Sequence, residues 1–312
     1  MNLGHPITRD PRIVIFTDDP GWHGRKLRQA FADRGHEGVY VSLMDCRLDL
    51  AGSGAAVVIP GFEGRLPHGV FVRGVPGGTL EQVILRLDVL HALREFGVVV
   101  YNDARAIERT VDKAMTSLLL KCAGLPTPDT WICESEPQAR AIVIGELARG
   151  RRLVAKPLFG SQGEGVRLIE KVEDLDDREG LAGVFYLQSF QEKAAAEWTD
   201  VRVFVINGKA LAAMHRISGH WITNRARGGR CQALVPDLAL AALAEDAARA
   251  VAIDYAGVDL IPLAGGGYTV TEVNSVPAWQ GLQAVSSVDI AASLTDHFFA
   301  RIVASAVLQA VP

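Results

Sequence analysis

The stretch Val270-Thr271-Glu272-Val273-Asn274 places a carboxylate and an amide oxygen two residues apart near the end of a 312-residue chain. Its β-branched residues favour a β-strand, in which alternate side chains lie on one face about 7 Å apart. Glu272 and Asn274 are therefore expected to face the same side. Mg²⁺ accepts one or two protein carboxylates and completes its octahedron with waters and nucleotide phosphates. The spacing predicts a metal and nucleotide site, but it also occurs on solvated polar strand faces, so further ligand-binding residues are required elsewhere.

Composition places the chain among ordinary soluble globular proteins. A length of 312 residues predicts two or three subdomains, and 49% hydrophobic residues suffice for sizeable cores. A net charge of −4 with 22% charged residues argues against a nucleic-acid partner. The four cysteines, at positions 46, 122, 133 and 231, form no C-x-x-C pair, which argues against a zinc site and fits a reducing cytoplasm. We find no signal peptide and no uninterrupted apolar run of membrane-spanning length, so we expect no membrane insertion.

The first hundred residues alternate between short apolar runs and helical patterns, which predicts an open α/β domain. We expect its strands at residues 12–16, 38–42, 56–59, 70–72 and 98–101, and its helices at 22–34 and from Thr79 to Gly97. Thr79 and Gln82 match a capping box at the start of the second helix. The loop after the first strand is Thr17-Asp18-Asp19-Pro20-Gly21 rather than G-x-G-x-x-G, so dinucleotide binding is not expected there.

Beyond a boundary near Arg105, helices and strands follow in a different pattern. We expect helices at residues 113–123, 135–148, 238–251 and 290–308, and strands at 153–156, 184–190, 200–206, 210–217, 254–261 and 268–274. Asp112 is placed to cap the first of these helices, and Gly124 to end it. Asn207-Gly208 is a strong signal for a two-residue hairpin turn, which predicts an antiparallel sheet.

A second informative stretch is Val154-Ala155-Lys156-Pro157-Leu158-Phe159-Gly160-Ser161-Gln162-Gly163-Glu164-Gly165-Val166. Its lysine lies at the end of a strand, and its glycines allow the backbone to fold closely over a ligand. Exposed backbone amides and a lysine ammonium together can cradle phosphate oxygens. The order differs from a Walker A motif, in which the lysine follows the glycines and precedes a helix. A flexible hairpin with a surface lysine is the alternative interpretation.

Several further polar motifs occur in a characteristic order along the chain. They are Asp112-Lys113, the K-P-x-x-G-S-Q-G-E-G loop at 156–165, Asp200-Val201-Arg202, Arg216, Asn224 with Arg227-Gly228-Gly229, Gly257-Val258-Asp259, and Glu272-Val273-Asn274-Ser275-x-Pro277. With this set the chain resembles the ATP-grasp superfamily and, within it, the RimK-like α-L-glutamate ligases, over about residues 70 to 300. The resemblance implies an α/β ATP-grasp fold with a preATP-grasp domain at residues 1–105, a central lid subdomain at 106–190 and a C-terminal subdomain with the metal site at 191–312.

The resemblance also implies roles for individual residues. The nucleotide phosphates would contact Lys113, Lys156 and the loop residues Gly160, Ser161, Gln162, Gly163 and Gly165. The adenine hinge and ribose contacts would come from Gln188, Ser189, Phe190 and Asp200, with the hinge extending to Gln191. Mg²⁺ or Mn²⁺ would be held against the ATP phosphates by Asp259, Glu272 and Asn274. The transferring phosphate and the acyl intermediate would lie under Arg202, Arg216, Asn224 and Arg227. Ser189 departs from the family, which often has an acid there; Glu192 or Glu197 are candidates to replace it.

Simpler interpretations stay open for some of these residues. Asp259 is equally the kind of strand carboxylate that forms a structural salt bridge, and Arg216 and Arg227 are charges of the kind usually found at the surface. His215 and His220 have no partners at metal-binding spacing. Arg73 ends a strand of the first domain, where α/β sheets bind ligands, so it is a candidate to hold a substrate carboxylate.

The sequence therefore predicts an ATP-dependent ligase that forms C–N bonds. A carboxylate is a poor electrophile, and phosphoryl transfer from ATP would convert it to an acyl phosphate that an amine can attack. The resemblance implies that L-glutamate is added to a carboxylate acceptor: a cofactor of the tetrahydromethanopterin or methanofuran type, a polyglutamate or a protein C-terminus. We expect small-molecule partners, no nucleic acid, no membrane, and a homo-oligomer, either dimer or tetramer. A D-alanine–D-alanine-type ligase and a non-catalytic ATP-binding regulatory protein are the alternatives.

Overall fold

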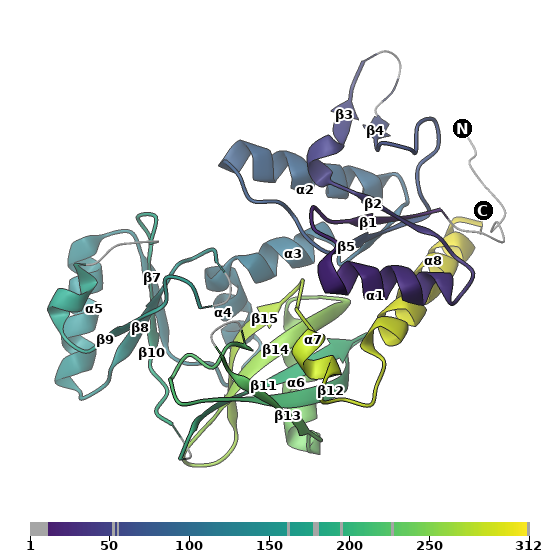
Figure 1. Cartoon of the computed structure of the whole chain (residues 1–312). Helices are drawn as coiled ribbons and strands as arrows, with labels where there is room; N and C mark the ends of the chain where they lie inside the picture. The colour runs from purple at the N-terminus through teal and green to yellow at the C-terminus, as the bar shows by residue number, and fades with distance from the viewer. Residues whose placement is uncertain are drawn as a thin grey trace.

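The computed structural model describes residues 12–51, 54, 56–160, 163–176, 181–193, 196–225 and 228–310. A parallel sheet in the order β2-β1-β5-β6 opens the chain (Figure 1). Its elements are β1 (Ile13–Phe16), α1 (Gly21–Ala32), β2 (Gly38–Val41), β5 (Gly69–Val72), α2 (Leu80–Glu95) and β6 (Val99–Tyr101). Every residue of β1 and β5 is buried because helices cover both faces of the sheet, as parallel sheets require. The capping box predicted at Thr79 and Gln82 is present.

The prediction that residues 56–59 continue this sheet is wrong. Instead, β4 (Ala56–Val58) pairs antiparallel with β3 (Arg47–Asp49) in a separate two-stranded ribbon. Within the sheet, β1 pairs with β2 on one side and with β5 on the other. Only Val57 in the middle of β4 is buried, so this short run covers the domain core rather than lying within the sheet.

A four-stranded antiparallel sheet follows, in the order β7-β10-β8-β9. Two helices lead into it, α3 (Ala104–Val111) and α4 (Lys113–Cys122). Asp112 caps α4 as predicted, since its side chain accepts hydrogen bonds from the N–H groups of Ala114 and Met115. The sheet consists of β7 (Thr130–Cys133), β8 (Leu153–Lys156), β9 (Arg167–Ile169) and β10 (Phe185–Ser189), and α5 (Glu136–Ala148) packs on one face. No bounds were predicted for β7 or β9.

The third sheet is antiparallel and has the order β13-β12-β11-β14-β15. It contains β11 (Trp198–Ile206), β12 (Lys209–Ser218), β13 (Arg230–Leu234), β14 (Tyr255–Pro262) and β15 (Tyr268–Asn274), with α6 (Leu238–Ala250) packed against it. The hairpin predicted between β11 and β12 is present: Asn207 and Gly208 have φ values of 52° and 66°, as a type I′ turn demands. A short helix, α7 (Gln280–Gln283), follows β15.

The C-terminal helix α8 (Ile290–Ala310) returns to the first sheet, beside α1 (Figure 1). Phe298 of α8 stacks on Phe31 of α1 at 5.8 Å between ring centroids. Residues 290–308 are also long and apolar enough to cross a membrane, with a mean hydropathy of 1.2 and 33% of the segment buried. Core helices of soluble proteins share this character, and the buried side of α8 belongs to the core between the first and third sheets. The division at residues 105 and 190 stays a prediction.

Candidate active site

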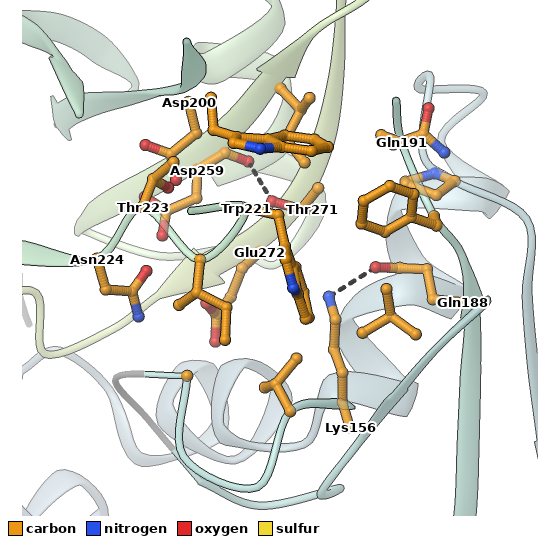
Figure 2. Close-up of a pocket in the computed structure, with 18 of the residues that line it drawn as sticks. Lys156, Gln188, Gln191, Asp200, Trp221, Thr223, Asn224, Asp259, Thr271 and Glu272 are labelled. Carbon is orange, nitrogen blue, oxygen red and sulfur yellow. Dashed lines mark hydrogen bonds between the residues drawn. The ribbon is translucent and has the colours of Figure 1, made fainter. Parts of the chain in front are cut away.

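An open cleft with an empty volume of about 1150 Å³ lies between the second and third sheets. Most of the predicted site residues line it: Lys113, Lys156, Gly160, Gly163, Gln188, Ser189, Phe190, Asp200, Arg216, Asn224, Asp259 and Glu272. Figure 2 shows Lys156 and Gln188 on one wall, facing Asp259, Glu272 and Asn224 from the other. Gly165, Arg202 and Asn274 are not among the lining residues. Ser161, Gln162 and Arg227 lie outside the described residues.

Two lysines mark the phosphate-binding end predicted from the sequence. Lys156 Nζ lies 2.7 Å from Gln188 Oε1, and Lys113 Nζ lies 2.8 Å from the carbonyl oxygen of Gly160. Burial lowers the pKa of Lys156 to about 8, with Glu272 opposing the shift and Lys113 adding to it. Burial likewise lowers the pKa of Lys113, against the opposing effect of Glu272. Because neither ammonium has a carboxylate within salt-bridge distance among the described residues, both are available to an anionic ligand.

The loop after Lys156 depends on its glycines for shape. Gly163 and Gly165 have φ values of 72° and 68°, in the left-handed region that favours glycine. A Cβ at Gly165 would lie 2.6 Å from Pro157 Cγ, closer than side-chain atoms approach. Gly165 therefore lies directly against Pro157, which lines the cleft.

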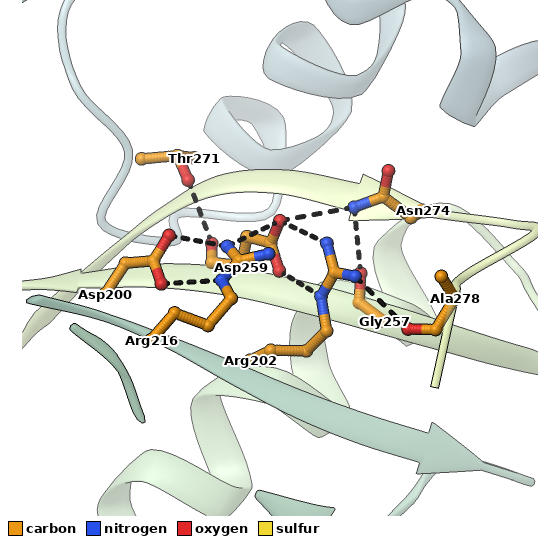
Figure 3. A network of polar contacts seen from close by, with 8 residues as sticks. All are labelled: Asp200, Arg202, Arg216, Gly257, Asp259, Thr271, Asn274 and Ala278. Atoms are coloured by element: carbon orange, nitrogen blue, oxygen red, sulfur yellow. Dashed lines mark hydrogen bonds and ion pairs between the residues drawn. The ribbon is translucent and has the colours of Figure 1, made fainter. Parts of the chain in front are cut away.

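Two aspartates and two arginines form a buried network on the opposite wall (Figure 3). Asp200 receives Nε of Arg216 at 2.7 Å and its Nη2 at 2.5 Å. Asp259 receives Nε and Nη2 of Arg202, both at 2.7 Å, and Arg216 Nη2 at 3.1 Å. Bidentate pairs of this kind are the strongest arginine contacts to carboxylates. In this structure Asp259 is therefore a salt-bridge partner, as the alternative interpretation of the sequence expected.

The charges in this network hold one another ionised. Burial raises the pKa of Asp259, but Arg202 and Arg216 outweigh burial and hold that pKa below its usual range. Burial lowers the pKa of Arg216, whereas Asp259 and Asp200 together raise it above its usual value. A largely buried, fully charged network next to a lysine pair is well suited to stabilise charge that moves between oxygens during phosphoryl transfer.

The predicted metal set offers oxygen atoms of the type that Mg²⁺ prefers. Glu272 forms no hydrogen bond or salt bridge with any described residue, and it lines the cleft. Asn274 donates through Nδ2 to the carbonyl of Gly257 at 3.3 Å and to Asp259 Oδ2 at 3.5 Å, which leaves its own oxygen free. The described part of the chain has no cluster of three His, Cys, Asp or Glu side chains. Two carboxylates and one amide nevertheless fit Mg²⁺, which takes its remaining ligands from water and phosphate.

The predicted adenine hinge has most of its hydrogen-bonding groups already engaged. The N–H of Ser189 donates to Asp129 O at 2.8 Å, and that of Phe190 donates to Arg152 O at 2.9 Å. Glu192, a candidate replacement for the hinge acid, is instead paired with Arg152 at 2.7 Å. The other candidate, Glu197, lies 3.4 Å from Arg230. The N–H of Gln191 has no acceptor among the described residues, and Gln191 lines the cleft.

Sequence reasoning missed the aromatic lining of the cleft. The ring of Phe190 meets those of Trp198 and Trp221 edge-on, with centroids 5.5 and 5.6 Å apart. The guanidinium of Arg152 lies over the Phe190 ring, 4.6 Å from its centroid. Both tryptophans line the cleft, and they provide the flat apolar surface that a nucleobase needs. Trp221 lies in an irregular loop, so no periodic pattern indicated that it lines a site. Tryptophan is rare in this chain, with 5 in all, and that rarity was the only sequence signal for Trp221.

The remaining candidates lie elsewhere. His215 alternates with Arg216 along β12 and therefore points to the opposite face of the sheet, where its Nδ1 is buried without a hydrogen-bond partner. Burial lowers the pKa of His215. Arg73 follows β5 and is not among the residues that line the cleft.

Comparisons with known proteins agree with this geometry. The chain is similar to the tetrahydromethanopterin:α-L-glutamate ligase of Methanococcus maripaludis, with 34% identity over 236 residues that cover 73% of this chain and 77% of that one. It is 31% identical to a probable α-L-glutamate ligase of Sodalis glossinidius, over 93% of this chain and 97% of that one. Among solved structures, the ATP-grasp ligase PsnB with its minimal precursor, Mg and ADP matches the fold with a TM-score of 0.69, 23% identity and coverage of 94% of this chain and 97% of that one.

A family model described as the RimK-like ATP-grasp domain matches residues 110–298, which include the whole cleft. The family predicted from the ordered motifs is thereby confirmed, and so is the fold class. The chain belongs to the RimK-like ATP-grasp family.

Proposed function

We propose that this protein is an ATP- and Mg²⁺-dependent ligase that joins the amine of L-glutamate to a carboxylate acceptor through an acyl phosphate. The single observation that supports this most is the position of two lysines, which have no carboxylate partner among the described residues, opposite Glu272 and the arginine–aspartate network across one cleft. The substrate assignment is supported by the names of the relatives, which are α-L-glutamate ligases.

The chemistry has two steps. One oxygen of the acceptor carboxylate attacks the γ-phosphorus of ATP, the bond to the β-phosphate oxygen breaks, and ADP leaves. The glutamate amine then attacks the acyl carbon, loses a proton, and expels inorganic phosphate as the amide forms. Activation is needed because a carboxylate alone is a poor electrophile, and positioning together with charge stabilisation supplies most of the catalysis.

The cleft residues divide between these tasks. Lys113 and Lys156 hold the ATP phosphates, and the glycine-rich loop closes over them. Arg216 turns from Asp200 and Asp259 toward the transferring phosphoryl group. Its 3.1 Å contact with Asp259 already places it close to the metal ligands. Asn224, which lines the same wall, contacts the acyl intermediate. Arg227 belongs to the same predicted set.

The nucleotide base lies against Trp221 and Phe190 at the other end of the cleft. The unpaired N–H of Gln191 donates to a ring nitrogen of adenine, in place of an acidic hinge residue. Asp200 reaches the ribose hydroxyls once Arg216 has turned away. Ser189 contributes through its position between Gln188 and Phe190, because its N–H is already bound to Asp129.

Glu272, Asn274 and Asp259 would hold magnesium, which when bound neutralises the charge on the β- and γ-phosphates. Asp259 is available to it only when both Arg202 and Arg216 release the carboxylate. The free oxygens of Glu272 and Asn274 need no such rearrangement, since neither is held by a described residue.

The acceptor is a small carboxylate molecule of the tetrahydromethanopterin or methanofuran type, a polyglutamate or a protein C-terminus, and the reaction takes place in the cytoplasm. The four free cysteines support a reducing compartment. A homo-oligomer is the proposed assembly. A D-alanine–D-alanine-type ligase would have the same nucleotide residues, and a non-catalytic ATP-binding protein would not require the unpaired Glu272.

An acceptor screen tests the proposal. The protein is incubated with ATP, Mg²⁺, L-glutamate and one candidate acceptor at a time, and ADP release and product mass are followed together. We expect ADP release coupled to a gain of one or more glutamyl residues, and loss of both in Glu272→Gln. Asp246→Asn, which removes an exposed carboxylate on α6, is the control and keeps the activity. ADP release without any amide would favour a different amine substrate, and no Mg²⁺-dependent turnover would refute the proposal.

A further inference from the structure

Arg73 occupies the ligand-binding edge of the first sheet. It follows directly on the last residue of β5, at the carboxyl edge where open α/β sheets bind their ligands. Its Nη1 donates to the carbonyl of Pro277 at 3.3 Å, and its guanidinium lies 4.6 Å from the ring centroid of Trp279. The side chain therefore reaches from the first domain to the segment that follows the metal strand β15.

This arginine has no anionic partner among the described residues. Asp18 and Asp19, in the loop after β1, are hydrogen-bonded elsewhere, to the hydroxyl of Ser42 and to the N–H of Gly21. Burial lowers the pKa of Arg73, and the hydroxyl of Tyr255 only partly compensates. A half-buried guanidinium without a carboxylate is unfavourable, because it has lost water without gaining a counter-charge.

A second unpaired arginine approaches the same segment from the third sheet. Arg225 Nη1 lies 3.1 Å from Gln280 Oε1 and forms no ion pair with a described residue. Between the two arginines, His23 Nε2 accepts from the N–H groups of Trp279 at 3.1 Å and of Gln280 at 3.3 Å. Burial lowers the pKa of His23 to about 4, with Arg73 and Arg225 lowering it further. The imidazole is thus neutral, and the potential around it is positive.

The segment also connects these cations to the reaction centre. Arg202, which holds Asp259, reaches the carbonyl of Ala278 at 3.4 Å, one residue from the carbonyl that Arg73 contacts. Arg73 and Arg202 therefore approach neighbouring peptide groups of one short loop. Trp22 and His23 at the start of α1 pack edge-on against Trp279 and connect this loop to the first domain.

We propose that Arg73 and Arg225 form a substrate-carboxylate subsite, which takes a carboxylate that does not react in the ligation. The inference rests on the proposed function, because it places the subsite beside the metal end of the catalytic cleft. Glutamate brings two such carboxylates to a reaction at its amine, and a polyglutamate acceptor brings several. Arginine forks match carboxylate geometry, and Arg73 and Arg225 both contact residues 277–280, so each can offer a fork to a carboxylate bound at this segment.

Equilibrium binding tests the subsite without turnover. L-glutamate and an α-linked triglutamate peptide are titrated separately by calorimetry into the full chain with Mg²⁺ and a non-hydrolysable ATP analogue. We expect Arg73→Gln to weaken at least one of them by about 10- to 100-fold, the usual effect of losing a hydrogen-bonded charge partner. Weaker glutamate binding assigns the carboxylate to the amine substrate, and weaker triglutamate binding assigns it to the acceptor. Arg73→Lys retains part of the affinity, and Arg225→Gln repeats the loss more weakly.

Controls separate this result from misfolding and from failure of the proposed function. Arg28→Gln removes an exposed arginine of α1, whose guanidinium lies 4.9 Å from the ring centroid of Tyr40. This variant leaves both affinities unchanged. The affinity for the ATP analogue stays the same in every variant, which shows that the cleft is intact. The subsite is overturned if Arg73→Gln binds both ligands as tightly as the wild type, or if neither ligand binds the wild type. Failure of the proposed function would instead be seen as absence of ADP release by the wild type.

Discussion

Arg202 competes with Mg²⁺ for Asp259, and Arg202→Gln should expose this competition. The side chains of Arg202 and Asp259 are only 13% and 8% exposed and share two hydrogen bonds of 2.7 Å. Removing one partner of a buried ion pair costs about 3–5 kcal/mol. Because Arg216 still lies 3.1 Å from Asp259, we expect the lower end of that range, about 3 kcal/mol. The melting temperature should therefore fall by several degrees.

Mg²⁺ should restore part of this loss in the variant. With the guanidinium gone, Asp259 joins Glu272 and Asn274 as a ligand, and Mg²⁺ replaces the lost positive charge. For a dissociation constant of about 1 mM, 20 mM Mg²⁺ adds about 1.8 kcal/mol of stability. The assay is thermal unfolding with and without Mg²⁺, in the absence of nucleotide, followed by tryptophan fluorescence. Wild type should respond much less, because its Asp259 is already paired.

A matched control uses an exposed arginine pair. Arg249→Gln breaks the contact with Asp246 on α6, where both side chains are largely exposed, and should change stability by less than about 1 kcal/mol with no dependence on Mg²⁺. Equal responses of wild type and Arg202→Gln to Mg²⁺ would refute the competition. They would also remove the reason for placing Asp259 among the metal ligands.

Three further outcomes follow from the structure. With the pKa of Lys156 at about 8, affinity for the ATP analogue should be nearly constant below about pH 7 and fall about tenfold by about pH 9 as the ammonium loses its proton. Calorimetry of Lys156→Met should show a weaker but flat profile. Gly165→Ala should lower that affinity, because its Cβ would lie 2.6 Å from Pro157, whereas Gly150→Ala, with a similar positive φ but open space, should affect stability alone. Asn102→Asp should lower the free energy of unfolding, measured in urea, by about 3 kcal/mol or more. The buried Asn102 Nδ2 donates to two carbonyl oxygens, at 2.7 and 2.9 Å, which a carboxylate would repel. An unchanged urea midpoint of unfolding would contradict this prediction.

Local signals predicted the elements and the motif residues well. The Asn207-Gly208 turn, the Asp112 cap and the Thr79 capping box are decided by a few neighbouring residues, and all three are confirmed. The lysines and the acids of the metal strand also meet in one cleft, as the order of motifs indicated. Residues that line a site through regular elements were therefore accessible from the sequence.

Long-range pairing was not accessible. The strand at 56–58 is a short apolar run, and nothing in its own residues indicates that it pairs with β3 rather than with the parallel sheet. The pairing of Arg216 with two aspartates depends on three strands meeting in one register, which no local pattern encodes. Trp221 lines the cleft from an irregular loop. The position of Arg73 became informative only through its contact with Pro277, which is 204 residues away in the sequence.

Transfer of a labelled oxygen tests the central claim most directly. The carboxylate of an acceptor that yields an amide is enriched in heavy oxygen and incubated with the protein, ATP, Mg²⁺ and L-glutamate. An acyl phosphate leaves one acceptor oxygen bound to phosphorus, so one labelled oxygen should appear in the inorganic phosphate for each amide formed, as mass spectrometry would detect. Two results would contradict the account: label that appears in AMP, or amide formation with phosphate that carries no label.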